Sequence, residues 1–311
     1  MAFTHDIAVA AQALLAGELV AFPTETVYGL GADATNDAAV ARVYAAKGRP
    51  AFNPLIAHVP EAEAAFRLGE FPEAARKLAV EFWPGPLSIV VPRRKDCPVS
   101  LLASSGLDSI ALRVPNHPVA LELLRAVGRP VVAPSANPSG RVSPTTAEHV
   151  RRHLGNQVSV ILDGGRCKVG VESTVVSFLN DGPKLLRPGG IGRAEIERVA
   201  GVTLAVESQT ARPHSPGQLE SHYAPTAELR LSAVGPRDGE VYLGFGTHAH
   251  GPYSLSPSGD LVEAAANLFR LLHDIDATGV GHIAVAPIPH HGLGEAINDR
   301  LSRAAAPRPS P

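Results

Sequence analysis

Apolar residues in the first 200 positions follow two patterns, one with a helical period and one of short runs bounded by Pro or Gly. Apolar spacing of three or four predicts helices, and short apolar runs predict buried strands. Gly17 and Gly48 would end the first two helices, and Asn36 can cap the second. The predicted helices cover residues 7–16, 37–47, 72–82, 117–127 and 145–154, the last with Thr145 as its candidate cap. The predicted strands cover residues 19–22, 54–59, 87–91, 109–114, 130–133, 158–162, 174–178 and 183–186.

Helices and strands alternate throughout this region, which indicates the α/β fold class. The last two strands flank Asn180-Asp181-Gly182, a sequence that strongly predicts a hairpin. Because a hairpin joins antiparallel strands, we predict a mixed sheet rather than a parallel one.

Residues 206–226 are polar, rich in turn formers and without an apolar period, so they are predicted to be a linker. The segment ends in Ser221-His222-Tyr223-Ala224-Pro225, which is too aromatic for a simple spacer. Strands and helices alternate again beyond it, as in a small Rossmann-like domain. The predicted strands are 229–231, 240–245 and 283–286, and the predicted helices are 261–272 and 293–305. The organisation we expect is a first domain at 1–205, a linker at 206–226 and a small α/β domain at 227–311.

Composition narrows the class of protein. The chain of 311 residues is 45% hydrophobic and carries a formal net charge of −2, so nothing in its overall charge points to nucleic acid. No apolar run approaches the roughly 20 residues of a membrane span, and no secretory signal is evident, so we expect a cytoplasmic protein.

Cys97 and Cys167 form no Cys-x-x-Cys pair, which argues against zinc and disulfides. The cationic neighbours of Cys167 could lower its thiol pKa, but we interpret it as a bystander.

Candidate chemistry begins with residues 22–31, where hydroxyl side chains follow an apolar strand. Thr24 and Thr26 would stand at the mouth of a cleft, because open α/β sheets bind ligands where strands end. The alternative is a strand turn with glycines. Lys47 and Arg49 follow a helix, and a constrained pair of cations suits phosphate oxygens, although cations also end helices for dipole reasons alone. No P-loop is present, so separate side chains would have to hold any nucleotide.

Five further polar groups lie at strand ends. Each group has an ordinary structural alternative: a surface ion pair for Arg113, a satisfied core histidine for His58, and turns with caps for the others. Recurrence at successive strand ends favours one shared crevice. The groups are His58, Arg113, Ser135-Ala136-Asn137 with Ser143, Gly170-Val171-Glu172-Ser173-Thr174 and Leu186-Arg187-Pro188-Gly189.

These motifs, in this order, closely resemble those of the YrdC-type threonylcarbamoyl-AMP synthases. The resemblance covers nearly all of residues 5–200, and the part from about residue 206 resembles the longer version of the family. The motifs that carry it are Phe22 to Gly31, Lys47-Gly48-Arg49-Pro50 with Asn53-Pro54-Leu55, Pro84-Gly85-Pro86-Leu87, Ala111 to Pro115, Ala133 to Asn137, Gly170 to Thr174 and Leu186 to Gly189. It implies a YrdC-like twisted sheet with a concave cleft.

The resemblance also implies a reaction: L-threonine, bicarbonate and ATP give threonylcarbamoyl-adenylate and diphosphate, for N6-threonylcarbamoyladenosine in tRNA. The residues implied to hold threonine are Thr26, His58, Arg113 and Ser173. Those implied to hold ATP are Arg49, Asn53, Ser109, Ala133 by its backbone, Ser135, Asn137, Ser143, Arg187 and Tyr223, with Lys47 and Arg49 as the catalytic cations. Mg²⁺ would be held through the ATP phosphates. The partner would be the tRNA-modifying threonylcarbamoyl transferase machinery, and a transient tRNA contact is allowed.

Two other functions compete with this interpretation. A concave basic face could bind RNA, although the overall acidity and few aromatic residues argue against recognition by stacking. A carbamoyl-transfer domain, as in hydrogenase maturation proteins, would be expected with zinc-binding cysteines, which the sequence lacks.

Overall fold

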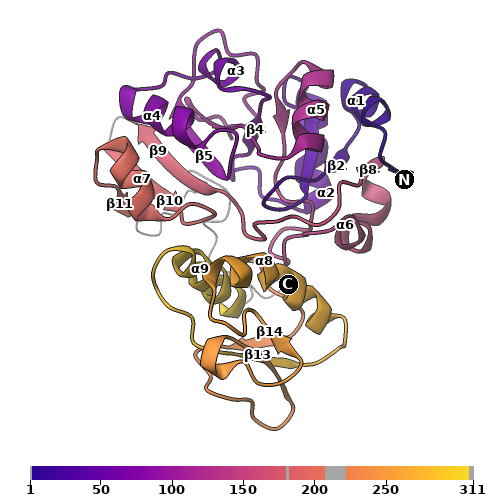
Figure 1. The fold of residues 1–311 in the computed structure, drawn as a ribbon. Helices are drawn as coiled ribbons and strands as arrows, with labels where there is room; N and C mark the ends of the chain where they lie inside the picture. The colour runs from indigo at the N-terminus through magenta and orange to yellow at the C-terminus, as the bar shows by residue number, and fades with distance from the viewer. Residues whose placement is uncertain (1, 180–181, 207–221, 308–311) are drawn as a thin grey trace.

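The computed structural model describes residues 2–179, 182–206 and 222–307. A larger α/β domain is followed by a smaller one, and helices α8 (Leu261–Asp276) and α9 (Leu293–Ala305) of the smaller domain lie next to the larger domain (Figure 1). The predicted linker falls mostly on residues 207–221, which lie outside the described residues. None of the described helices has the length and hydropathy of a membrane span.

The larger domain is built on one mixed sheet of 11 strands among the described residues. The strand order is β1-β8-β2-β3-β7-β4-β6-β5-β9-β10-β11, with both parallel and antiparallel neighbours, so the predicted mixed sheet is confirmed. β9 and β10 pair antiparallel, as the hairpin signal predicted, although residues 180–181 are not described. The strands are β1 (Ala2–Thr4), β2 (Val20–Phe22), β3 (Gly29–Asp33), β4 (Ile56–His58), β5 (Leu87–Pro92), β6 (Ser109–Arg113), β7 (Val131–Val132), β8 (Val160–Leu162), β9 (Thr174–Leu179), β10 (Gly182–Arg187) and β11 (Ala205–Val206).

Helices cover both faces of this sheet; the five predicted ones are present within two residues of their predicted bounds, and α3 and α7 were not predicted. Asn36 caps α2 by accepting from the amide of Ala39, and Gly48 ends that helix at a φ of +56°. Thr145 was the wrong cap for α6, because Thr146 accepts from the amide of His149 instead. The helices are α1 (Ile7–Leu15), α2 (Asp37–Lys47), α3 (Ala62–Phe66), α4 (Glu73–Phe82), α5 (Pro118–Val127), α6 (Ala147–Leu154) and α7 (Arg193–Ala200).

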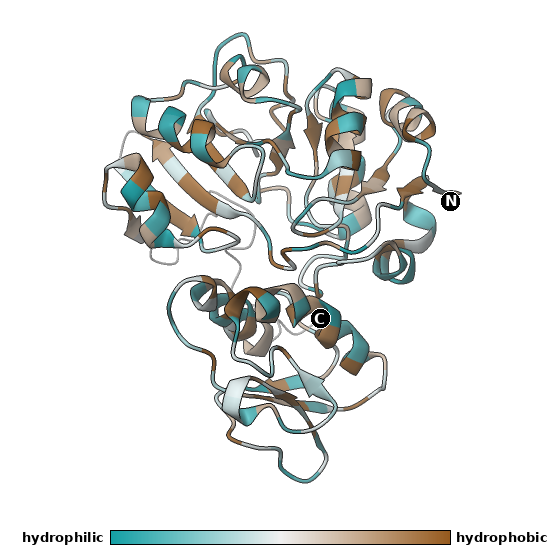
Figure 2. Cartoon of the chain, in the orientation of Figure 1, coloured by the Kyte–Doolittle hydropathy of each residue, from teal (hydrophilic) through white to brown (hydrophobic). Residues whose placement is uncertain are grey.

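Strand β3 begins inside the segment that the sequence indicated as a polar turn. Gly31 pairs with Val20 of β2, and a Cβ on Gly31 would lie 2.8 Å from the Phe22 ring. The phenylalanine ring fills the space that a side chain on β3 would need, so the strand uses glycine and escapes detection by its apolar pattern. Figure 2 shows the sheet strands as largely hydrophobic and the outer helix faces as hydrophilic, as expected for a sheet buried between helices.

The smaller domain has a parallel sheet of four strands in the order β12-β15-β13-β14, covered by α8 and α9. This arrangement confirms the predicted small Rossmann-like α/β domain. The short strand β14 was not predicted from the sequence. The strands are β12 (Glu228–Arg230), β13 (Glu240–Gly244), β14 (Tyr253–Ser254) and β15 (His282–Val285).

The two domains share an apolar cluster. Val27, Val142 and Val171 of the larger domain pack with the core of the smaller one. Gly170, at a φ of +76°, lies against α8 so closely that a Cβ would sit 2.4 Å from the carbonyl oxygen of Ala265. The loops that carry the candidate site are therefore packed directly against α8.

A cluster of histidines also spans the domain interface. The ring centroids of His149 on α6 and His273 on α8 are 3.9 Å apart, and His153 lies 5.0 Å from His273. His273 Nε2 donates to the carbonyl of Ser143, 3.1 Å away, so the ring carries a proton on Nε2. Burial lowers the pKa of His149 to about 4 and that of His273 to about 2, with Arg152 and the neighbouring histidines adding to the effect.

We expect the protein to lose stability on acidification through this cluster. Because both folded-state pKa values lie below the ordinary value of 6.5, the unfolded chain binds more protons between pH 6.5 and about 4, and stability falls as the pH drops through that window. The loss is about 2 kcal/mol per histidine near pH 5. In urea unfolding, the free energy of unfolding should fall more steeply toward low pH for the wild type than for His273→Gln. Parallel curves would contradict this expectation.

Candidate active site

The polar segments at successive strand ends converge on one buried cavity of about 40 Å³ beside the domain interface. It therefore has room for only a few water molecules. Its lining includes eight of the residues predicted from the sequence. The lining residues are Val27, Arg49, Ile56, His58, Arg113, Ala133, Pro134, Ser135, Glu172, Ser173, Arg187, His222 and Tyr223.

Two cations from the end of α2 form one side of the site. The ammonium of Lys47 donates to the carbonyls of Ser135 and Asn137 at 2.6 and 2.5 Å. Arg49 donates through Nη2 to the side chain of Asn53 at 2.6 Å and to the carbonyl of Pro54 at 2.9 Å. Gly48 and the constrained Pro-rich turn thus aim both cations inward rather than toward solvent.

Burial changes the protonation of these groups. It lowers the pKa of Lys47 well below its ordinary value, and the neighbouring Arg49 lowers it further. It lowers the pKa of Arg49 to about 10. Charged groups that are disfavoured by burial are stabilised by an opposite charge. An anionic ligand between Lys47 and Arg49 would therefore be held strongly.

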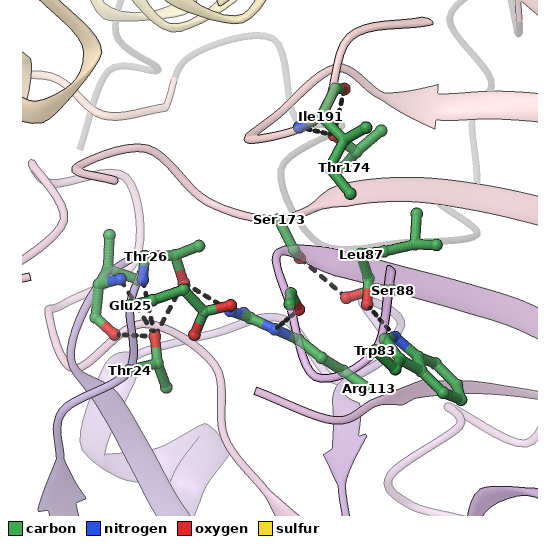
Figure 3. Close-up of polar contacts among 12 residues, drawn as sticks. Thr24, Glu25, Thr26, Trp83, Leu87, Ser88, Arg113, Ser173, Thr174 and Ile191 are labelled. Carbon is green, nitrogen blue, oxygen red and sulfur yellow. Dashed lines mark hydrogen bonds and ion pairs between the residues drawn. The ribbon is translucent and has the colours of Figure 1, made fainter. Parts of the chain in front are cut away.

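A third cation, Arg113, lies at the end of β6 and points toward the loop after β2 (Figure 3). Its Nη2 donates to Glu25 at 2.7 Å and to Thr26 at 3.0 Å, while Nε donates to the carbonyl of Gly85 at 3.4 Å. His58 on β4 is neutral, because burial and the charge of Arg113 lower its pKa to about 3. The surface ion pair that the sequence left open for Arg113 is wrong, since both partners are buried.

Arg187, at the end of β10, is hydrogen bonded to Ser173, the residue before β9. It donates to the carbonyl of Ser173 at 2.9 Å and to its hydroxyl at 3.0 Å, and Ser173 is also hydrogen bonded to Ser88 at 2.8 Å (Figure 3 shows the serine pair). Burial lowers the pKa of Arg187. Ser173 thus reaches the cavity on a fixed backbone, between Arg113 and Arg187.

The remaining predicted residues lie around these cations. Ser143 donates to Glu172 at 2.5 Å, and the side-chain nitrogen of Asn137 is bonded to the carbonyls of Pro138 and Arg141. Ser109 does not line the cavity; it lies at the opposite end of β6 from Arg113.

Tyr223 closes the cavity from the end of the predicted linker. Its ring stacks on Phe269 of α8, and the guanidinium of Arg300 on α9 lies 5.2 Å from the ring centroid. Its φ of +62° is unusual for a residue other than glycine, so the surrounding contacts hold the backbone in place. His222 packs on the same ring at 4.0 Å, and burial among the site cations lowers its pKa well below its ordinary value.

Sequence reasoning did not assign roles to three charged residues of the site. Glu25 and Glu172 occur within quoted motifs, so a buried carboxylate among cations could have been inferred. Arg300 gave no signal, because it lies in a helix with an ordinary amphipathic pattern more than 100 residues away. It is 1% exposed and donates to Glu172 at 2.9 Å.

Several buried polar atoms around the cavity lack a hydrogen-bond partner among the described residues. Buried polar groups are nearly always paired, so a concentration of unpaired ones indicates a place for a ligand. The atoms near the site are Glu25 Oε2, Asn53 Nδ2, Asn137 Oδ1, His222 Nδ1 and Arg300 Nη2.

Cys167 is not activated. Burial raises the pKa of its thiol, and this outweighs the cationic neighbours that suggested a lower value from the sequence. The interpretation of Cys167 as a bystander fits its burial.

The fold and the site define a two-domain α/β protein with a buried, cation-rich site at the domain junction. The sequence model of the family described as "Telomere recombination" matches residues 12–189, and the model described as "Threonylcarbamoyl-AMP synthase, C-terminal domain" matches residues 191–306. The threonylcarbamoyl-AMP synthase of Bacillus subtilis is 43% identical over 98% of this chain and 95% of its own. The one from Pyrococcus abyssi is 43% identical over 97% and 94%.

A crystal structure of the P. abyssi protein complexed with L-threonine has a TM-score of 0.89 to this chain, at 40% identity over 96% of this chain and 94% of that one. The chain belongs to the threonylcarbamoyl-AMP synthase family, in the long form with the additional C-terminal domain. The resemblance stated from the motifs is thereby confirmed.

Proposed function

We propose that the protein joins L-threonine, bicarbonate and ATP into threonylcarbamoyl-adenylate with release of diphosphate, for N6-threonylcarbamoyladenosine in tRNA. Membership of the family makes it a threonylcarbamoyl-AMP synthase, a nucleotidyltransferase. The observation that carries the assignment of residues is the charge of the site. Among the described residues, five cations (Lys47, Arg49, Arg113, Arg187 and Arg300) surround two carboxylates (Glu25 and Glu172).

Threonine would occupy the Arg113 side of the site. Arg113 uses Nε and Nη2 in its bonds to the described residues, which leaves Nη1 to bind the threonine carboxylate. Thr26, His58 and Ser173 lie around it and would fix the amino acid's orientation. The unpaired oxygen of Glu25 could accept from the amino group, so Glu25 joins the predicted threonine residues.

ATP would occupy the side formed by Lys47, Arg49 and Arg187. The predicted ATP residues Asn53, Ala133, Ser135, Asn137, Ser143 and Tyr223 lie around these cations, whereas the predicted ATP residue Ser109 does not line the cavity. Threonine and bicarbonate give a carbamate and water; a carbamate oxygen then forms a bond to the α-phosphorus as the bond to diphosphate breaks. Such a transfer needs positioning and charge neutralisation rather than a protein nucleophile.

Mg²⁺ would bind through the ATP phosphates. The described residues contain no group of three His, Cys, Asp or Glu side chains able to hold a metal ion, whereas the ammonium, guanidinium and hydroxyl groups suit phosphate oxygens. When bound, Mg²⁺ would offset negative charge on the phosphates. Lys47, Arg49 and Arg187 would neutralise the rest.

Substrate entry would require the segment of His222 and Tyr223 to move. The cavity of about 40 Å³ is far below the roughly 300 Å³ of a small-molecule site, and these two residues form part of its wall. Their return over the nucleotide would exclude water from a mixed anhydride that hydrolyses readily. We propose that residues 206–226 are the linker that makes this closure, between domains at 1–205 and 227–311. The product would then pass to the threonylcarbamoyl transferase machinery.

The purified chain should release diphosphate from ATP only when L-threonine and bicarbonate are both present. The assay measures diphosphate and the adenylate product together, with serine and glycine as alternative amino acids. Release that is indifferent to threonine would exclude the synthase assignment. An RNA-binding module would instead give tight, salt-sensitive tRNA affinity that survives loss of Lys47 and Arg113.

A further inference from the structure

One buried charged side chain of the C-terminal domain, Arg300, reaches the active site. Arg300 extends from α9 into the larger domain, where its Nε donates to Glu172 at 2.9 Å and its Nη1 donates to the carbonyl of Pro188 at 2.8 Å. The neighbouring Asp299 accepts from the same Nη1 at 2.7 Å. The guanidinium also lies over the ring of Tyr223. A single arginine therefore touches the catalytic loops and the tyrosine that closes the cavity.

Glu172 presents an electrostatic difficulty for a site that binds ATP. Its carboxylate lines the cavity, and its second oxygen accepts from Ser143, a predicted ATP residue. An uncompensated carboxylate beside phosphate groups would repel them strongly, because the interaction is poorly screened in a buried site. The contact with Arg300 removes this repulsion and holds the carboxylate on Ser143.

We propose that Arg300 is a positioning residue of the C-terminal domain for ATP: it neutralises Glu172 and holds that carboxylate away from the nucleotide phosphates. This inference rests on the proposed placement of ATP beside Lys47, Arg49 and Arg187. It gives the C-terminal domain a direct part in nucleotide binding. Arg300 Nη2, which is buried and has no partner among the described residues, is a further donor beside the phosphates.

The test compares Arg300→Met, Glu172→Gln and the double variant as full-length proteins. Arg300→Met should raise the KM for ATP at least about tenfold, since it leaves a buried charge unpaired, and change the KM for threonine less than about twofold. Adding Glu172→Gln removes the negative charge of the Glu172 carboxylate, so the double variant should recover most of the ATP affinity. Binding of a non-hydrolysable ATP analogue should show the same order by calorimetry.

Arg166→Met is the matched control. Arg166 also crosses the domain interface, donating to the carbonyl of Ala266 at 2.9 Å and to Asn267 at 2.8 Å, but it is exposed and outside the cavity lining. Its loss should leave the KM for ATP unchanged. Thermal unfolding of each variant identifies those that fail to fold.

Three results would overturn the proposal: an unchanged ATP KM in Arg300→Met, an equal rise for threonine, or a defect that Glu172→Gln leaves in place. The last two would mean that Arg300 only supports Tyr223 or the domain interface. A wild-type chain that forms no threonylcarbamoyl-adenylate would contradict the proposed function instead, so the two failures are distinguishable.

Discussion

Replacing Lys47 by methionine is expected to lower kcat by roughly 100-fold to 1,000-fold, the range for removing one group that stabilises charge developing in a transition state. Lys47 is 3% exposed and held by two carbonyls from the loop after β7, so its ammonium occupies a fixed position among the site cations. Burial lowers the pKa of Lys47, and bound phosphates would raise it again, so that the ammonium is protonated and attracts the phosphates. The measurement is steady-state adenylate formation with all three substrates saturating.

A structural effect must be separated from this catalytic one. Loss of the ammonium leaves the carbonyl of Asn137 without its donor, whereas that of Ser135 still accepts from the amide of Asn137 at 3.0 Å; the unpaired carbonyl costs about 1–3 kcal/mol of stability. Urea unfolding measures this cost directly, and assays run well below the unfolding transition avoid it. Lys77→Met is the matched control, because Lys77 is 54% exposed and pairs only with Glu73 on the surface of α4. If the Lys47→Met protein kept a third of the wild-type kcat, the role of Lys47 would be structural and not catalytic.

The sequence predicted most of the elements that position the site, because caps and apolar spacing are local signals. Asn36 and Gly48 bracket α2, and Pro residues around the strand ends mark where chains leave the sheet. The convergence of Arg113 and Arg187 on one cavity followed from a general rule about strand ends, and Arg49, which follows helix α2, lines the same cavity. Their assignment to threonine or ATP came only from the family resemblance, and it stays a prediction.

Contacts that cross the domain boundary could not be predicted from the sequence. Arg300 and Glu172 are 128 positions apart, and nothing in the sequence pattern of α9 distinguishes Arg300 from Arg303 on the same helix. The histidine cluster was missed for the same reason, since His149 and His273 meet only when α8 docks on α6. Strand β3 was not predicted because it contains glycines. The Phe22 ring occupies the space that a side chain at Gly31 would need, so the strand lacks a clear apolar period.

Arg113→Ala is expected to raise the KM for threonine about 30-fold or more while changing the KM for ATP only a few-fold, because it removes one partner of a buried charge pair. Part of the damage would come from Glu25, left buried without its cation. The double variant Glu25→Gln with Arg113→Ala separates the two effects: it should regain stability against urea but not affinity for threonine. Arg42→Ala, which removes the exposed pair with Glu18 and a hydrogen bond to the carbonyl of Gly17, is the matched control. If the double variant bound threonine as the wild type does, Arg113 would serve only to neutralise Glu25, and the carboxylate of the amino acid would have to be held elsewhere in the site.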